Sequence, residues 1–230
     1  MASKIGLTNN QLKMIAMLAM LLDHIGMVLL PKVTILRIIG RVSFPIFAYM
    51  VGEGFAHTRN RGRYLLQMLG LAAVCQIGLY VATGSLLQCV VVSFTLAITV
   101  MFSIEFCQKR FTLLSVAVLA ITFAAVLFTV LILPELLPGT DFAVDYGLPG
   151  ILIPIIACYA PKRIWKLILT ALCMVVRGLT YGGIQWFCLL SILLLVCYNG
   201  QRGSRKIKYL FYIFYPVHLV AIYGIGELLL

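Results

Sequence analysis

The sequence predicts an all-α polytopic integral membrane protein, a helical bundle of about nine transmembrane helices, and two observations carry that prediction. Apolar residues make up 63% of the 230 residues and charged residues only 11%, against roughly 45 to 50% and 25% in soluble globular proteins. Apolar runs of about 20 residues, long enough to cross a hydrocarbon layer, recur from Gln11 to the C-terminus. We expect a single transmembrane domain over residues 1–230 and no soluble domain.

The apolar runs are continuous rather than alternating, and a helix satisfies its own backbone hydrogen bonds in lipid, so helices are favoured over a β-barrel. The run 112–133 carries no charge and is the clearest, whereas 148–160 is short and holds Pro149 and Pro154, which is typical of a kinked or re-entrant segment. Eight or ten spans also fit the pattern. The predicted spans are 11–30, 37–57, 64–83, 86–106, 112–133, 148–160, 164–180, 183–198 and 209–229.

The first apolar run is expected to be a retained helix and not a cleaved signal peptide. It is long, contains Asp23 and His24, and lacks a small-x-small cleavage site. The seven cysteines are odd in number, form no Cys-x-x-Cys pair and lie in or at the ends of apolar segments. We interpret them as buried thiols, and no metal site is predicted.

The net charge of +11 comes from basic residues that separate the apolar runs and form no single patch. They therefore mark topology and contacts with lipid headgroups, and nucleic-acid binding is set aside. Under nine alternating spans, 14 basic residues fall on one side and three on the other, which places the N-terminus in the cytoplasm and the C-terminus outside. The 14 are Lys4, Lys13, Arg59, Arg61, Arg63, Lys109, Arg110, Lys162, Arg163, Lys166, Arg202, Arg205, Lys206 and Lys208; the three are Lys32, Arg37 and Arg177. Glu135, Asp141 and Asp145 are expected in the loop after the fifth span.

Charged residues inside spans are costly, so each is a functional hypothesis. Asp23 and His24 lie in the first span and Arg37 and Arg41 open the second. Neighbours on a helix point about 100° apart, so Asp23 and His24 do not face each other. We predict that Asp23 pairs with Arg41 or Arg37 while His24 points into another sector. A purely structural role, locking the first two helices together, is the alternative.

The cytoplasmic end of the second span, GEGFAHTRNRGRY, concentrates polar residues. Glu53 is flanked by Gly52 and Gly54, which permit close approach of a backbone or ligand. Guanidiniums at this mouth suit a phosphorylated, nucleotide-bearing ligand, although for Arg61 and Arg63 a positive-inside anchor is the favoured interpretation. No P-loop, dinucleotide-binding glycine pattern, zinc-hydrolase or serine-hydrolase motif is present.

The last span contains FYPVHL, in which Pro216 loosens the helix and His218 is expected to stack on the Phe214 and Tyr215 side. An aromatic belt accounts for Tyr209 and Tyr212. For His218, lining a pocket and bridging helices remain equally open.

At these residues the sequence resembles the TraX family, named for the conjugation protein required for N-terminal acetylation of F-type pilin. The resemblance is dense over LKMIAMLAMLLDHIGMVLLP and RIIGRVSFPIFAYMVGEGFAHTRNRGRYLLQ, with later pieces DYGLPGIL and KYLFYIFYPVHL. The family is related to transmembrane acyltransferases, including heparan-glucosaminide N-acetyltransferase and bacterial polysaccharide O-acetyltransferases. The resemblance therefore implies transfer of an acetyl group from acetyl coenzyme A (acetyl-CoA).

Matching motifs by position assigns the Asp-His pair to Asp23 and His24, Arg-x-Ser-Phe-Pro to Arg41, Glu-Gly-Phe to Glu53, Thr-Arg-Asn to Arg59 and Asn60, and Phe-Tyr-Pro-x-His to His218. Our hypothesis makes His24 the general base, with Asp23 and Arg41 fixing its surroundings. The predicted catalytic residues are His24, Asp23, Arg41 and Glu53. The predicted acetyl-CoA-binding residues are Arg37, His57, Arg59, Asn60, Tyr64, Tyr215 and His218.

The expected partners are acetyl-CoA, membrane lipid, and an amine or hydroxyl acceptor such as a pilin-like peptide or a glycan. The expected location is the bacterial inner membrane. A small proton-coupled transporter or flippase is the main alternative, because such proteins also bury Asp, His, Arg and Glu, and a purely structural membrane subunit is the third. The sequence leaves the acceptor, the oligomeric state and the choice between a ternary complex and an acetyl-enzyme open.

Overall fold

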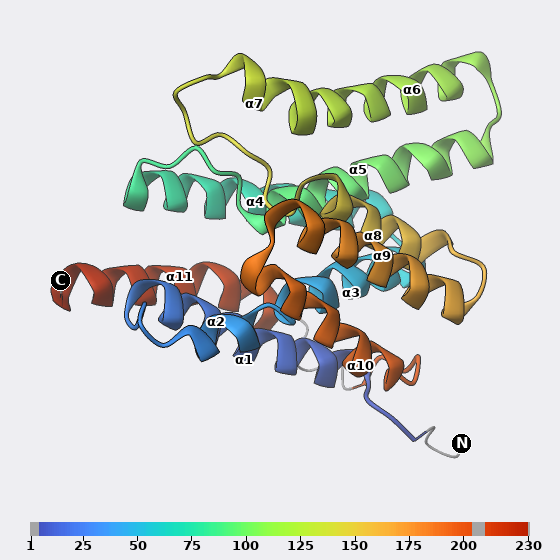
Figure 1. Cartoon of the computed structure of the whole chain (residues 1–230). Coiled ribbons are helices and arrows are strands. Elements are labelled where there is room, and N and C mark those ends of the chain that lie inside the picture. Colours follow the sequence, from blue (N-terminus) through green and yellow to red (C-terminus); the bar gives the residue numbers. More distant parts are fainter. Residues whose placement is uncertain (1–4, 204–209, 230) are drawn as a thin grey trace. The chain divides into compact units, whose positions relative to one another are not determined.

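A computed structural model describes residues 5–203 and 210–229, and these are helical over most of their length (Figure 1). They form no β-strand, only isolated bridges between Leu7 and Tyr198 and between Gln88 and Val144. Four of the predicted cytoplasmic basic residues and one belt aromatic lie outside the described residues: Lys4, Arg205, Lys206, Lys208 and Tyr209. The all-helical fold class is confirmed.

The chain divides into two compact units, which we describe separately. Unit 1 comprises Met1–Met50 with Pro161–Leu230, and unit 2 comprises Val51–Ala160. Helix α3 (Ser43–His57) runs from the first into the second. The expectation of one transmembrane domain over the whole chain stays a prediction.

Unit 1 brings the two ends of the chain together. Its helices are α1 (Asn9–Val28), α2 (Thr34–Gly40), the first part of α3, α9 (Arg163–Tyr181), the 3-10 helix η2 (Gly183–Leu189), α10 (Leu190–Val196) and α11 (Leu210–Leu229). Thr8 begins α1 with a capping box, because its hydroxyl accepts from the Gln11 N–H while the Gln11 side chain accepts from the Thr8 N–H. Just before this cap, the Leu7 N–H donates to the Cys197 carbonyl at 2.7 Å. In Figure 1 α11, in red, lies beside α1, in blue, with which it packs.

Unit 2 is built on an antiparallel hairpin. Its helices are the end of α3, α4 (Arg61–Thr83), α5 (Val90–Lys109), α6 (Leu113–Leu127), the π-helical turn η1 (Phe128–Ile132), α7 (Leu133–Leu136) and α8 (Gly147–Tyr159). Helices α5 and α6 turn back on each other at Thr112, whose side chain caps α6 (Figure 1). A small core of this unit joins α5, α6, the following loop and α8 through Ala97, Val100, Val126, Val144 and Ile151.

Two loops of unit 2 are joined through Asp141. One carboxylate oxygen accepts from the Ser85 hydroxyl at 2.5 Å and the other from the Leu86 N–H at 2.7 Å. The Ser85 hydrogen bond, and then that from Leu86, hold the pKa of Asp141 below its usual value, because they favour the ionised form. Asp145 also lies in the predicted loop, whereas Glu135 lies in the short helix α7, so its loop placement was wrong. The helical segment continues past the predicted span end at 133 to Leu136.

All nine predicted spans correspond in order to helical segments. Seven of these are long and apolar enough to cross a membrane: Asn9–Val28, Thr34–His57, Arg61–Thr83, Val90–Lys109, Leu113–Leu136, Arg163–Tyr181 and Leu210–Leu228. The other two, Gly147–Tyr159 and Gly183–Val196, are shorter. The 13 residues of α8 rise about 20 Å, less than the roughly 30 Å hydrocarbon layer, as its short sequence and two prolines predicted. The protein is a polytopic integral membrane protein.

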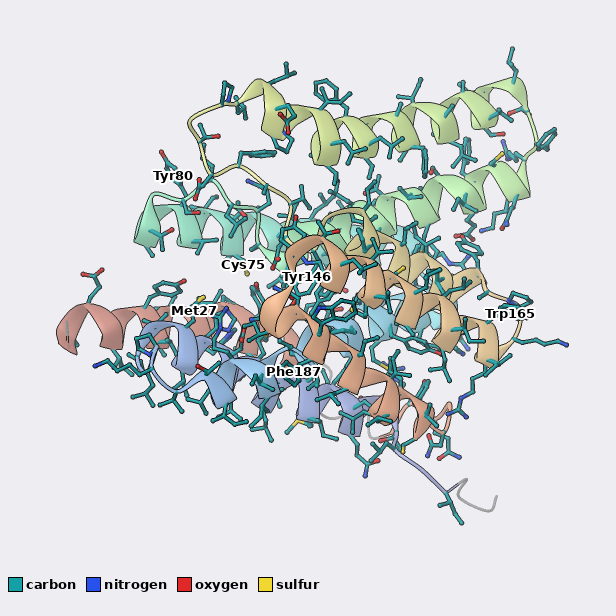
Figure 2. All side chains as sticks on the ribbon, in the orientation of Figure 1. Met27, Cys75, Tyr80, Tyr146, Trp165 and Phe187 are labelled. Atoms are coloured by element: carbon teal, nitrogen blue, oxygen red, sulfur yellow. The ribbon has the colours of Figure 1, made fainter. Side chains whose placement is uncertain are left out.

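Large apolar side chains cover much of the outside of the helices (Figure 2). Trp165 and Tyr80, labelled in Figure 2, are about half exposed, and Leu113 and Leu228 are almost fully exposed. Such a surface suits lipid and would be an aggregation hazard in water. Five of the seven cysteines are buried as predicted, whereas Cys158 is half-buried and Cys197, at the end of α10, is exposed.

Candidate active site

Asp23 joins α1 to α2 through two guanidiniums. A terminal nitrogen of Arg41 donates to both carboxylate oxygens of Asp23, at 2.6 Å for Oδ1. Nε of Arg37 lies 3.5 Å from Oδ1. The predicted pairing across the first hairpin is therefore confirmed, with both candidate arginines on one carboxylate. We call Asp23, Arg37 and Arg41 the Asp23 cluster.

Gly40 makes this close approach possible. A Cβ at Gly40 would fall within the contact distance of Cβ, Cγ and Oδ1 of Asp23, so any larger residue would displace the carboxylate. Arg41 follows directly as the C-terminal cap of α2, where its N–H donates to the Arg37 carbonyl. The C-terminal end of α2 therefore packs closely against Asp23 at Gly40, and the next residue, Arg41, places its guanidinium on the Asp23 carboxylate.

The contacts of His24 lie outside the Asp23 cluster, as the 100° turn between neighbouring helical residues predicted. Its Nδ1 lies 2.8 Å from the carbonyl oxygen of Met20, one turn earlier on α1. A carbonyl oxygen only accepts hydrogen bonds, so Nδ1 carries the proton and the lone pair of the neutral ring is on Nε2. A neutral imidazole with a lone pair on Nε2 is the form that a general base requires.

His218 on α11 packs directly against His24. The two rings stand edge to face with centroids 4.9 Å apart. The His218 ring stacks on Phe214 at 4.6 Å and meets Tyr215 edge to face at 5.5 Å, as the sequence predicted. Unit 1 therefore brings the Asp-His pair of the first helix to the Pro-x-His motif of the last, more than 190 residues apart in the chain.

The remaining predicted residues lie in unit 2, around the end of α3. Glu53 is buried, while His57 is exposed, with Nδ1 2.8 Å from the Glu53 carbonyl oxygen and 4.0 Å from its carboxylate. Gly52 faces the backbone of Pro154 on α8, and a Cβ at Gly54 would lie 3.2 Å from the Tyr64 hydroxyl. Gly52 thus allows the close approach of a backbone and Gly54 that of a side chain, as their positions on either side of Glu53 predicted.

Some of the predicted phosphate-binding residues are exposed, whereas others already bind groups within the protein. Arg59 and Arg63 are exposed. The side-chain oxygen of Asn60 accepts from the Arg63 N–H at 2.9 Å as the cap of α4. Arg61 instead pairs with Glu105 on α5, and its guanidinium lies 5.1 Å from the Phe55 ring.

Glu105 is shared by Arg61 and by Lys109, whose Nζ lies 2.7 Å from the same carboxylate. We call these three residues the Glu105 cluster. Sequence analysis did not single out Glu105. The sequence pattern that could have identified it is a lone acidic residue in an apolar span, four positions before a lysine. This spacing places both residues on one helix face.

Sequence analysis also used Arg177 only as a topology marker. It is buried within α9, and its guanidinium lies 3.6 Å from the Tyr181 ring centroid, a cation–π contact that stabilises a charge in an apolar segment. Its position inside an apolar span could have identified it as a buried charge.

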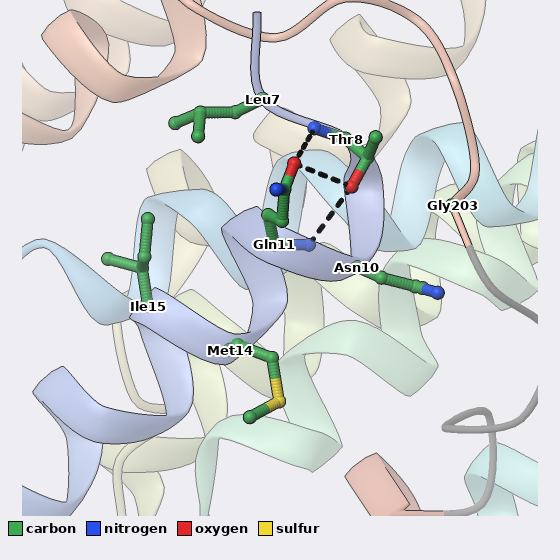
Figure 3. A pocket seen from close by; sticks show the side chains of 7 residues that line it. All are labelled: Leu7, Thr8, Asn10, Gln11, Met14, Ile15 and Gly203. Atoms are coloured by element: carbon green, nitrogen blue, oxygen red, sulfur yellow. Dashed lines mark hydrogen bonds between the residues drawn. The ribbon is translucent and has the colours of Figure 1, made fainter.

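A hollow of about 650 Å³ lies at the start of α1 in unit 1 (Figure 3). Its wall is mostly apolar, with Leu7, Met14 and Ile15 beside the Thr8 and Gln11 capping box. None of the predicted catalytic or binding residues lines it. The hollow is therefore separate from the candidate active site.

Comparisons with known proteins agree with the resemblance over almost the whole chain. Residues 8–226 match the family described as TraX protein. The chain is similar to a probable fimbrial assembly protein FimC, serogroup H1, of Dichelobacter nodosus, at 28% identity over 95% of this chain and 96% of that protein. It is also similar to the uncharacterized protein RP591 of Rickettsia prowazekii (strain Madrid E), at 34% identity over 44% of each chain. No solved structure matches the chain.

Proposed function

Because the chain belongs to the TraX family, we propose that it is a membrane-bound acetyltransferase that moves an acetyl group from acetyl-CoA to an amine or hydroxyl acceptor. His24 is the general base. The observation that carries the proposal is the arrangement in unit 1 of a paired intramembrane carboxylate, Asp23, next to an imidazole whose basic nitrogen is Nε2. Since a charge within a span is costly, such a cluster is a functional hypothesis by default.

The proposed reaction couples acyl transfer to the passage of one proton from the acceptor to His24 and then to the leaving thiolate. The acceptor nitrogen or oxygen attacks the thioester carbon while Nε2 of His24 takes its proton. The tetrahedral intermediate then collapses, the carbon–sulfur bond breaks, and the coenzyme A thiolate leaves with the proton that His24 returns. With acetyl-CoA and the acceptor as the two substrates, the atoms and charges balance without a further co-reactant.

The Asp23 cluster supports this chemistry electrostatically. One carboxylate faces two guanidiniums, so the cluster carries a net positive charge next to His24 in the chain. A fixed positive charge stabilises the negative oxygen that develops in the intermediate.

In unit 2, the exposed guanidinium of Arg59 and the free amide NH₂ of Asn60 suit the phosphates of coenzyme A. Glu53 is proposed to take part in catalysis, and His57 and Tyr64 are proposed to contribute to acetyl-CoA binding. Arg61 is better explained by its ion pair with Glu105.

For the acceptor we propose only a chemical class. The full-length similarity to a protein named for fimbrial assembly supports an acceptor associated with pili, such as a pilin-like peptide, and a glycan is the other class. We propose the bacterial inner membrane as the location, with the N-terminus in the cytoplasm.

The test uses the full chain in lipid nanodiscs with labelled acetyl-CoA and measures free thiol, water standing in for the acceptor. We expect slow thiol release that falls by 10²-fold or more in His24→Gln, which keeps a polar side chain but cannot take the proton. Leu18→Ala, on the exposed face of α1, is the matched control. Full turnover in folded His24→Gln would refute the base assignment. Absence of acetyl-CoA binding together with proton-coupled flux would favour the transporter alternative.

A further inference from the structure

His218 holds a buried polar atom that the fold leaves unused. The residue is 4% exposed. Among the described residues, no hydrogen-bond partner reaches its Nε2. Burying such a nitrogen without a partner costs free energy, so the position calls for an explanation.

The chemical form of the ring fixes what can bind there. Nδ1 lies 2.8 Å from the Phe214 carbonyl oxygen, which only accepts, so Nδ1 carries the proton. Nε2 is therefore an acceptor in the neutral ring. A ligand group at this atom must bring an N–H or O–H hydrogen.

The surroundings favour an uncharged donor. Three aromatic rings, those of Phe214, Tyr215 and His24, contact the imidazole of His218. An ammonium group buried among these rings would lose its hydration at a large cost in free energy, whereas a neutral amide N–H would lose far less.

The donor of the proposed reaction carries one such group at the required place. Its thioester oxygen and sulfur only accept hydrogen bonds, and the nearest N–H belongs to the amide two methylenes from the sulfur. That nitrogen and the thioester carbon are four bonds apart, roughly 5 Å when extended. The ring centroids of His218 and His24 are 4.9 Å apart.

We propose that Nε2 of His218 accepts a hydrogen bond from the pantetheine amide N–H nearest the sulfur, which sets the thioester carbon beside Nε2 of His24. This inference rests on the proposed acetyl transfer and names the part of the donor that unit 1 recognises. His218 is then a donor-binding residue and His24 the proton acceptor.

The test compares two short donors on the full chain in nanodiscs. S-acetyl-N-acetylcysteamine keeps the amide N–H, and its analogue has an ester oxygen in place of the N–H and so cannot donate this hydrogen bond. The readout is kcat and KM for thiol release or, for a donor that is not turned over, its inhibition constant against acetyl-CoA.

We expect the protein to prefer the amide donor about tenfold, because one hydrogen bond contributes a difference of this size. The difference should appear in KM or in the inhibition constant. His218→Phe should bring the preference to about one. His218→Gln should restore it, because the glutamine side-chain oxygen takes the place of Nε2. Ile213→Phe, on the exposed face of the same helix, is the matched control and should keep the preference.

Two results would overturn the inference. An equal preference for the amide donor in the unchanged protein and in folded His218→Phe would mean that another group binds the N–H. A loss of kcat for both donors in His218→Phe, unrestored by His218→Gln, would make His218 the proton acceptor instead. Absence of thiol release from acetyl-CoA in the unchanged protein is a different failure, that of the proposed function.

Discussion

In each unit a carboxylate is shared by two basic side chains, and the two clusters differ most in the burial of one of the cations. The carboxylates are alike, since the side chains of Asp23 and Glu105 are 15% and 13% exposed. Arg41 in the Asp23 cluster is only 8% exposed, whereas Lys109 in the Glu105 cluster is 70% exposed. Water can replace the carboxylate for an exposed ammonium but not for a buried guanidinium.

The comparison teaches that similar sets of charged groups serve different purposes. Asp23 is followed in the chain by His24, which packs on His218. Glu105 is paired with Lys109, the last residue of α5, and its other partner Arg61 lies near the Phe55 ring. A buried guanidinium next to an imidazole in the chain favours a chemical role for the first cluster, and the exposed ammonium favours an anchoring role for the second.

The largest expected effect is that of Asp23→Asn, which removes the carboxylate shared by Arg37 and Arg41. We expect a loss of about 3–5 kcal/mol in the free energy of unfolding, because breaking a buried ion pair leaves charge poorly compensated. Denaturant titration of the detergent-solubilised chain measures it. An effect below that of Glu105→Gln would contradict the comparison.

Gly40→Ala tests the same cluster without changing its charges. The added methyl group would overlap the Asp23 side chain and force the carboxylate off Arg41. We expect a loss of about 1–3 kcal/mol, typical of overpacking. Gly70→Ala is the matched control, since a Cβ at Gly70 meets no neighbouring atom within 4 Å. Equal stability of both variants would show that α1 and α2 adjust freely.

Glu105→Gln sharpens the comparison from the other side. Lys109 keeps its hydration when the carboxylate is removed, so we expect a loss of only about 1 kcal/mol. The loss should shrink as salt rises, because exposed charges are screened. Repeating the denaturant titration at low and high salt measures this, and a salt-independent loss would place Glu105 with the buried carboxylates.

Asp141 extends the series to a fully exposed carboxylate, and the smallest effect is expected there. Hydrogen bonds from Ser85 and Leu86 lower its pKa in the folded protein, so the ionised form stabilises the loop contact. This stabilisation is present above the ordinary aspartate pKa and is lost as pH falls through the lowered one. The difference in thermal midpoint between the unchanged protein and Asp141→Asn should therefore vanish at acidic pH. A difference that grows on acidification would have the wrong sign.

Much of the fold followed from the sequence because lipid imposes simple rules. Length and apolarity were sufficient to find nine apolar helical segments within the described residues, and the two prolines of 148–160 indicated the short α8. The 100° turn between Asp23 and His24 was sufficient to predict that the two side chains have different partners. Glu105 and Arg61 were not paired, because they are 44 residues apart on different helices and no local spacing relates them.

The sequence by itself determined that the protein is helical, spans a membrane and carries the TraX motifs, since these depend on residue type and local order. Only the tertiary structure decided which charges meet: that Arg41 and Arg37 share Asp23, that Arg61 binds Glu105, and that His218 packs on His24. The physical reason is that hydropathy acts on each segment alone, whereas an ion pair or a ring contact depends on how separate helices pack together.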